Sequence, residues 1–265
     1  MPTTLRLRCF DPRAIAESGQ CFRMLPTVGG ATVIASGRRL TIETLGGGRF
    51  RFSCDREGFD AFWRDYLDLN VDYAAMQREA PEGDAFLRRA IRCGHGLRIL
   101  RQDPWETLIG FILSQRKSIP AIRGCMERLC ERFGDDCGGY RAFPTASALA
   151  YADEATLRDC GLGYRAPYVL AAARAVAEDT LNLSALAALD DEALLQALAE
   201  LRGVGVKVTS CVALFGYHRL ACAPVDVWIA RVIDEEYGGR SPFGAYGAFA
   251  GLYQQYLFCL KRRQA

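Results

Sequence analysis

The sequence predicts an α+β fold in which an N-terminal antiparallel β-sheet is followed by a helical bundle. Short alternating segments separated by glycine turns fill the first third of the chain, and amphipathic helical patterns fill the rest. The chain has 265 residues, half of them hydrophobic, which is enough for two domains with buried cores. We therefore predict a sheet domain with flanking helices at 1–95 and a helical domain at 96–265.

The strands are predicted from apolar alternation and from the turns that bound it. Leu40 and Ile42 alternate with polar residues before the glycine triplet at 46–48. Phe50 and Phe52 do the same after the triplet, which predicts a hairpin with one buried face. The five predicted strands are Leu5–Phe10, Cys21–Leu25, Ala31–Ala35, Arg39–Leu45 and Arg49–Cys54.

The helices are predicted from their start and stop signals. Asp103 is an N-cap residue, Pro104 follows at the first helical position, and Glu106 completes the capping pattern. This helix should run to about Gln115. Other helices are predicted at Phe59–Leu69, with an aromatic face, at Ile119–Phe133 before Gly134, from Asp153 to Gly161, and from Asp190 or Asp191 onward.

Charge and cysteine content exclude some classes of protein. The formal net charge is +2, which neither shows nor excludes a nucleic-acid-binding face. The eleven cysteines are odd in number and match no standard metal pattern, which favours reduced thiols in a cytoplasmic compartment. No secretory signal opens the chain and no apolar run is long enough to span a membrane, so we expect no membrane association.

One segment contains residues suited to anion binding and catalysis. Gly203-Val204-Gly205 joins two apolar helical patterns by a tight turn, which leaves backbone N–H groups free for an anion such as a DNA phosphate. Lys207 begins the second helix, where the helix dipole disfavours a cation and so favours the nucleophilic neutral amine. Asp226 precedes another apolar helical stretch and can cap it.

The glycine hairpin, Lys207 and Pro224-Val225-Asp226 together resemble the helix-hairpin-helix DNA glycosylase superfamily, and within it the 8-oxoguanine DNA glycosylases. The likeness covers nearly the whole chain. Three further segments resemble that family at similar spacing: Ser18–Arg23, Leu100–Pro104 followed by Phe111-Ile112, and Gly161–Ala166.

The resemblance implies a base-excision repair enzyme that acts on double-stranded DNA containing oxidised guanine. The damaged nucleotide would be flipped out of the duplex, and Lys207 would attack C1′ to form a Schiff base that permits β-elimination. Asp226 would stabilise the positive charge that develops on the sugar. No cofactor is implied, and the lack of a cysteine cluster after Asp226 argues against an iron–sulfur cluster. We expect a cytoplasmic monomer, nucleoid-associated in a prokaryote.

The resemblance also assigns roles around the base. The Gly19 carbonyl would accept the N7–H that 8-oxoguanine has and guanine lacks. Gln254 would contact the Watson–Crick edge, and Phe258 and Cys211 would sandwich the ring. Gln254 and Phe258 are four residues apart and so share a helix face. The structural alternatives are that Phe258 and Cys211 are ordinary core residues and that Gln254 lies on the surface.

Contacts with the rest of the duplex are implied in the same way. Tyr164 would wedge into the duplex, and Arg165 would contact the base left unpaired. Arg116 stands where family members have an asparagine that fills the vacated space, and Ala121 replaces an arginine that contacts the opposite cytosine. These departures predict a weak preference for cytosine opposite the lesion.

Two competing interpretations stay open from the sequence. A monofunctional alkyl-base glycosylase shares the sheet-plus-helices plan but lacks the lysine, so Lys207 argues against it. A non-catalytic helix-hairpin-helix module would bind DNA through the hairpin glycines and would need neither Lys207 nor Asp226. Gly-x-Gly alone is a common tight turn, and Asp226 alone is a common helix cap.

Overall fold

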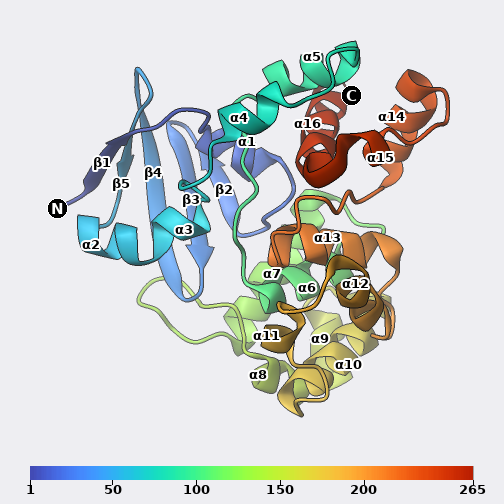
Figure 1. The fold of residues 1–265 in the computed structure, drawn as a ribbon. Helices are drawn as coiled ribbons and strands as arrows, with labels where there is room; N and C mark the ends of the chain where they lie inside the picture. The colour runs from blue at the N-terminus through green and yellow to red at the C-terminus, as the bar shows by residue number, and fades with distance from the viewer. Residues whose placement is uncertain (265) are drawn as a thin grey trace.

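The computed structural model describes residues 1–264 and confirms the predicted α+β architecture (Figure 1). A five-stranded antiparallel sheet in the order β1-β5-β4-β3-β2 comes first, and helices make up the rest of the chain. The strands are β1 (Thr3–Arg6), β2 (Met24–Thr27), β3 (Gly30–Ala35), β4 (Arg38–Gly46) and β5 (Arg49–Phe52).

The predicted β4–β5 hairpin is present with the expected face buried. Ile42 pairs with Phe52, and both side chains are fully buried together with Leu40. The register shifts between Thr44 and Gly46, where a bulge leads the strand into the glycine turn. Alternation of this kind fixes the register, because a slip by one residue would expose the whole apolar set.

The first strand lies earlier than predicted. β1 ends at Arg6 and does not continue to Phe10, because Cys9 adopts a left-handed conformation with φ of +47°. Asp11 then caps an unpredicted helix, α1 (Pro12–Glu17), by accepting hydrogen bonds from two backbone amides. The aspartate–proline pair was the overlooked helix signal.

The second strand begins later than predicted, at Met24 instead of Cys21. Gln20 is only 1% exposed and bonds to the chain before α6, not to a neighbouring strand. Its Nε2 donates to the Arg98 carbonyl at 2.9 Å, and its Oε1 accepts from Leu100 N at 2.8 Å. The segment 18–23 is therefore a connection that faces the helical region.

Most of the predicted helix starts are confirmed. Asp103 accepts a hydrogen bond from Glu106 N at 2.9 Å, and the helix that ends before Gly134 has the predicted bounds. The helices are α4 (Tyr73–Arg78), α5 (Ala85–Cys93), α6 (Pro104–Leu113), α7 (Ile119–Phe133), α8 (Ala146–Ala150), α9 (Glu154–Asp159), α10 (Ala166–Ala177), α11 (Leu183–Leu186), α12 (Asp191–Ala199), α13 (Val206–Gly216), α14 (Val227–Tyr237), α15 (Phe243–Tyr246) and α16 (Ala250–Arg263).

The helix predicted at Phe59–Leu69 is divided into shorter pieces. It consists of α2 (Arg56–Gly58), a π-helical turn at Phe59–Trp63 and α3 (Arg64–Tyr66). The aromatic face is nevertheless buried as expected, since Phe59, Trp63 and Tyr66 all lie in the core under the sheet.

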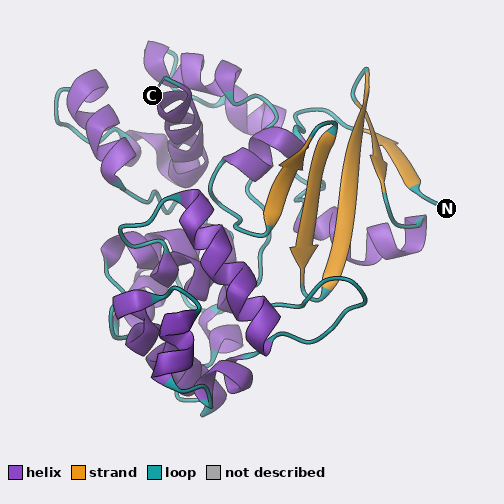
Figure 2. Cartoon of the chain, turned by 180° about the vertical axis from the view of Figure 1, so that it is seen from behind, coloured by secondary structure: helices purple, strands orange, loops and turns teal. Residues whose placement is uncertain are grey.

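The sheet stands beside the helices, as the view from behind shows (Figure 2). The last helix, α16, returns to pack beside α5, so the end of the chain lies next to a segment from its first third (Figure 1). Helices α4 and α5, which precede the predicted boundary at residue 95, pack into the helical core. In the described part of the chain, no helix is long and apolar enough to cross a membrane.

Glu106, a half-buried residue, lies on the first turn of α6. Its pKa is raised to about 8, mainly by desolvation of its carboxyl group; the nearby Arg23 acts to lower the pKa, and Asp103 and Glu127 act to raise it. The guanidinium of Arg23 is bonded elsewhere, since it donates to Glu127 Oε1 at 2.9 Å and to the Arg141 carbonyl at 2.7 Å. Glu106 is therefore held in its neutral form at neutral pH.

We expect Glu106→Gln to stabilise the protein increasingly as the pH rises from about 4.5 to about 8. The folded-state pKa of about 8 lies above the ordinary value of 4.5, so the wild-type free energy of unfolding is greatest below about pH 4.5, falls between the two values and levels off above pH 8. The amide cannot ionise and should gain roughly 2–4 kcal/mol over wild type near pH 9. Melting temperatures of both proteins across this range test the prediction, which a pH-independent difference would contradict.

Candidate active site

A cavity of about 740 Å³ opens between the α6–α7 turn, α13, α14 and α16. The segment 18–19 closes one side of it. Its walls are largely apolar and carry a few polar groups, as is typical of sites that bind small molecules. The structure brings seven predicted residues into this lining: Gly19, Arg116, Lys207, Cys211, Asp226, Gln254 and Phe258.

Lys207 lies on the first turn of α13. Its Nζ donates to Ser114 Oγ at 2.9 Å and lies 5.0 Å from the centroid of the Phe111 ring. Ser114 Oγ itself donates to the Phe111 carbonyl at 2.7 Å, so its lone pairs are left for the lysine. Among residues 1–264, no carboxylate lies within 4.0 Å of Nζ. The amine is thus held by a neutral hydroxyl and is not locked in an ion pair.

Asp226 is the N-cap of α14, as predicted. Its Oδ1 accepts hydrogen bonds from Trp228 N at 3.0 Å and from Ile229 N at 2.9 Å. Both bonds use the same oxygen, and in the described chain Oδ2 accepts none. The cap therefore holds the carboxylate at the wall of the cavity and leaves Oδ2 available to a positively charged group.

The hairpin between α12 and α13 requires its first glycine on two grounds. Gly203 has φ of +80°, and a Cβ there would lie 2.4 Å from the ring of Tyr168. Gly205 precedes α13, and the amides of Val206 and Lys207 donate to no backbone carbonyl within residues 1–264. Free amides at a helix N-terminus are suited to a phosphate.

Gly19 and Phe258 lie against each other in the cavity. Gly19 has φ of +78°, and a Cβ there would lie 3.6 Å from Phe258 Cε1 and 2.9 Å from Ile119 Cδ1. No described backbone amide donates to the Gly19 carbonyl. The Arg262 guanidinium lies 5.5 Å from the centroid of the Phe258 ring. The geometry therefore offers a free carbonyl beside an aromatic wall.

The remaining base-contacting candidates are also buried at the cavity. Cys211 is 3% exposed, and burial raises the pKa of its thiol to about 11, so the thiol is neutral at physiological pH. Gln254 is 2% exposed, which rules out the surface alternative. Its Oε1 accepts a hydrogen bond from Gln255 Nε2 at 3.0 Å.

Tyr164 and Arg165, the two adjacent residues predicted to contact the interior of the duplex, differ in exposure. Tyr164 is 47% exposed in the loop before α10 and could reach a partner. Arg165 is 5% exposed, and its Nε donates to the Gln115 carbonyl at 2.9 Å while Nη1 donates to the Leu162 carbonyl at 3.3 Å. Arg165 thus points inward, where backbone carbonyls use its donors, and its contact with the base left unpaired stays a prediction.

The turn between α6 and α7, residues 114–117, forms hydrogen bonds with three other parts of the site; we call it the crosspiece. Gln115 Nε2 donates to the Gly203 carbonyl of the hairpin at 3.0 Å. Lys117 Nζ donates at 2.8 Å to the carbonyl of Gly161, the first residue of the segment Gly161–Ala166 that contains Tyr164. With the bond from Lys207 to Ser114, the crosspiece joins the hairpin, this segment and the lysine.

Arg116 is the exposed member of the crosspiece. It lines the cavity and adopts φ of +49°, a conformation that asparagine and glycine adopt more readily than arginine does. Its guanidinium makes no hydrogen bond to residues 1–264 and is free to contact a ligand.

Sequence reasoning missed two residues of this site. The contact of Ser114 with Lys207 was overlooked, although Ser114 is the first polar residue after the apolar helix α6. Gln255 was passed over beside Gln254. The adjacent glutamines in an otherwise apolar helix were a signal, because buried amides need hydrogen-bond partners.

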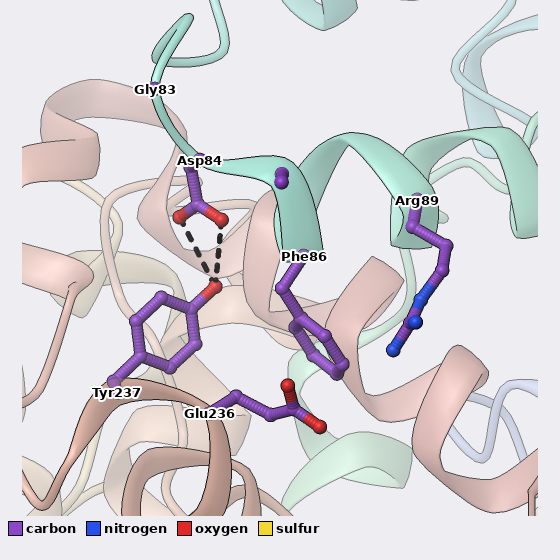
Figure 3. Close-up of a pocket in the computed structure, with 7 residues that line it drawn as sticks. Gly83, Asp84, Phe86, Arg89, Glu236 and Tyr237 are labelled. Atoms are coloured by element: carbon purple, nitrogen blue, oxygen red, sulfur yellow. Dashed lines mark hydrogen bonds between the residues drawn. The ribbon is translucent and has the colours of Figure 1, made fainter.

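A second pocket, of about 570 Å³, lies between α5 and α14 and contains none of the predicted residues (Figure 3). There the Asp84 carboxylate accepts from the Tyr237 hydroxyl at 3.1 and 3.2 Å, with Phe86 and Arg89 on the neighbouring helix. In the described chain, no three His, Cys, Asp or Glu side chains are grouped to hold a metal ion.

Comparison with known proteins identifies the family of this fold and cavity. Residues 109–241 match the HhH-GPD superfamily of base excision DNA repair proteins, and residues 4–108 match the N-terminal domain of 8-oxoguanine DNA glycosylase. An N-glycosylase/DNA lyase of Saccharomyces cerevisiae is 38% identical over 187 residues, 64% of this chain and 49% of that protein. The chain thus spans about half the length of the yeast relative.

Two further proteins match over more of their length. A probable N-glycosylase/DNA lyase of Methanothermobacter thermautotrophicus is 30% identical over 213 residues, which are 68% of each chain. The Clostridium acetobutylicum 8-oxoguanine glycosylase/lyase, solved with double-stranded DNA containing cytosine opposite 8-oxoguanine, superposes with a TM-score of 0.92 at 29% identity over 100% of this chain and 98% of that one. The chain therefore belongs to the HhH-GPD superfamily of base excision DNA repair proteins, in its 8-oxoguanine DNA glycosylase/lyase branch.

Proposed function

We propose that this chain excises 8-oxoguanine from duplex DNA through a Schiff base at Lys207 and can then nick the strand by β-elimination. One observation carries the proposal. Lys207 and Asp226, from different helices, line the same cavity as Gly19, Gln254 and Phe258. The proposed nucleophilic amine and the carboxylate thus lie at the wall of a cavity that would also hold the flipped base.

In this mechanism the flipped base stacks between Phe258 and the neutral thiol of Cys211. The Gly19 carbonyl accepts N7–H, a proton that ordinary guanine does not carry. Guanine would instead place its bare N7 lone pair against that carbonyl, leaving two buried acceptors face to face.

Lys207 Nζ then attacks C1′ as the bond from C1′ to N9 breaks and its electrons leave with the base. One proton of the amine goes to the departing base. The C1′–O4′ bond then breaks as the imine forms, and O4′ takes the second amine proton. The Asp226 carboxylate stabilises the positive charge that develops on the sugar. The sugar can approach both groups because they line one cavity. The free amides at the start of α13 bind a neighbouring phosphate.

The proposed partner is double-stranded DNA with oxidised guanine, bound by a monomer in the cytoplasm or at the nucleoid. Borohydride trapping tests the proposal directly. The wild-type protein should become covalently linked to a duplex containing 8-oxoguanine and should not be linked to the same duplex with guanine. Release of 8-oxoguanine without any covalent adduct would contradict the lysine mechanism.

Arg116 leads to an expectation about the base opposite the lesion. A guanidinium has no hydrogen-bond acceptor, so it cannot receive the amino proton of cytosine as an asparagine oxygen can. Wild-type protein should therefore show only a weak preference for cytosine, and Arg116→Ala should slow excision opposite every base without changing their order. Single-turnover rates against all four opposite bases decide the point. A steep preference for cytosine that Arg116→Ala removes would show that Arg116 selects the base.

A further inference from the structure

Two adjacent amides are buried at the cavity, and the proposed chemistry uses only one of them. Gln254 and Gln255 are 2% and 4% exposed, and both line the cavity from α16. Burying an amide costs stability unless its donors and acceptors are paired. Gln255 therefore needs an explanation of its own.

Only one end of the Gln255 amide is paired. Gln255 Nε2 donates to Gln254 Oε1 at 3.0 Å, while Gln255 Oε1 is sealed from solvent and has no hydrogen-bond partner among residues 1–264. An apolar side chain of similar size would avoid this unsatisfied carbonyl. The arrangement is thus poorly explained by stability alone.

The contact determines which way the Gln254 amide faces. An amide donates at Nε2 and accepts at Oε1, and its two ends have nearly the same shape. If Gln254 were turned over, its NH₂ group would face the NH₂ group of Gln255. With Oε1 held in place, Gln254 Nε2 keeps its hydrogens unpaired within residues 1–264, and this nitrogen is not among the sealed atoms.

We infer that Gln255 is a positioning residue that sets the base selectivity of the cavity through Gln254. The inference rests on the proposed function. A fixed Nε2 donor beside an oxygen with a second lone pair matches a purine with a carbonyl at C6 and a hydrogen on N1, as in 8-oxoguanine. The same amide mismatches 8-oxoadenine, whose C6 amino group would place two donors face to face.

These two lesions isolate the effect of Gln255. Both carry N7–H, so the contact with the Gly19 carbonyl is the same for each. They differ at the edge that Gln254 faces. The ratio of their single-turnover excision rates therefore reports the orientation of the Gln254 amide and not the overall integrity of the cavity.

The experiment compares Gln255→Met and Gln255→Glu with wild type, using duplexes that contain 8-oxoguanine or 8-oxoadenine. Met cannot donate, so Gln254 is free to turn and the 8-oxoguanine:8-oxoadenine ratio should fall by about tenfold. An ionised Glu can only accept, so it should draw Nε2 toward itself and lower the ratio further. If the Met variant does not fold, the Glu variant carries the test.

Tyr256→Phe is the matched control. Tyr256 lies on the same helix outside the cavity lining, and the substitution removes the partly buried hydrogen bond in which Gln77 Nε2 donates to the Tyr256 hydroxyl at 2.8 Å. Its ratio should equal that of wild type even if its melting temperature falls. Unchanged ratios in both Gln255 variants would overturn the inference and leave the proposed function intact. Failure of wild type to excise 8-oxoguanine would instead overturn the proposed function itself.

Discussion

Lys207→Gln is expected to bind lesion DNA while excision falls by at least roughly three orders of magnitude, since the nucleophile is lost. Glutamine nearly matches the length of lysine and can still donate toward Ser114 Oγ, so the fold of the cavity should survive. Borohydride trapping should disappear together with excision. Gel-shift binding and single-turnover assays on an 8-oxoguanine duplex measure the two effects separately.

The chain contains only three lysines, which makes the assignment easy to check. Lys261 forms an ion pair with Glu235 away from the cavity, so Lys261→Gln should keep wild-type trapping. Lys117 also lines the cavity, but its Nζ is bonded to the Gly161 carbonyl. If trapping survived in Lys207→Gln and vanished in Lys117→Gln, the nucleophile would be Lys117.

Asp226→Asn should slow excision by about 10²- to 10³-fold, as loss of a preorganised charge at a developing cation does. Asparagine keeps the oxygen that accepts from Trp228 N and Ile229 N, so the cap of α14 remains. The melting temperature should therefore change little, because asparagine and aspartate are comparable caps. Single-turnover rates and thermal melts on the same preparations test both statements.

Asp226→Ala provides the comparison, since it removes the charge and the cap together. It should slow excision similarly and also destabilise the fold by about 1 kcal/mol. An Asn variant with a wild-type rate would reduce Asp226 to a structural cap. Equal destabilisation by Asn and Ala would show that the cap depends on the charge and not on the shared oxygen.

Features determined by a few neighbouring residues could be predicted from the sequence. The Asp103-Pro104 start, the end of α7 before Gly134 and the cap at Asp226 depend on backbone geometry within one turn. The β4–β5 hairpin follows from alternation around a glycine turn. Family motifs then located Lys207 and the predicted base-contacting residues, which line one cavity.

Features determined by distant contacts were missed. Arg165 points inward because a carbonyl fifty positions earlier, that of Gln115, accepts its donors. Gln20 is buried against the chain before α6 because the backbone of Arg98 and Leu100 satisfies its amide. Local periodicity cannot reveal such pairings, because each partner looks like an ordinary exposed polar residue until the chain has folded.

The crosspiece also separates two kinds of residue: those whose hydrogen bonds hold the scaffold together and those whose side chains are free to vary. Gln115 and Lys117 reach across to the carbonyls of Gly203 and Gly161, and Arg165 reaches back to the carbonyl of Gln115. Each acceptor is a main-chain oxygen, which every amino acid supplies. Exposed side chains such as Arg116 and Tyr164 take no part in these bonds. Substitutions at these exposed positions can therefore change which opposite bases are tolerated without breaking the hydrogen bonds that hold the crosspiece beside Lys207.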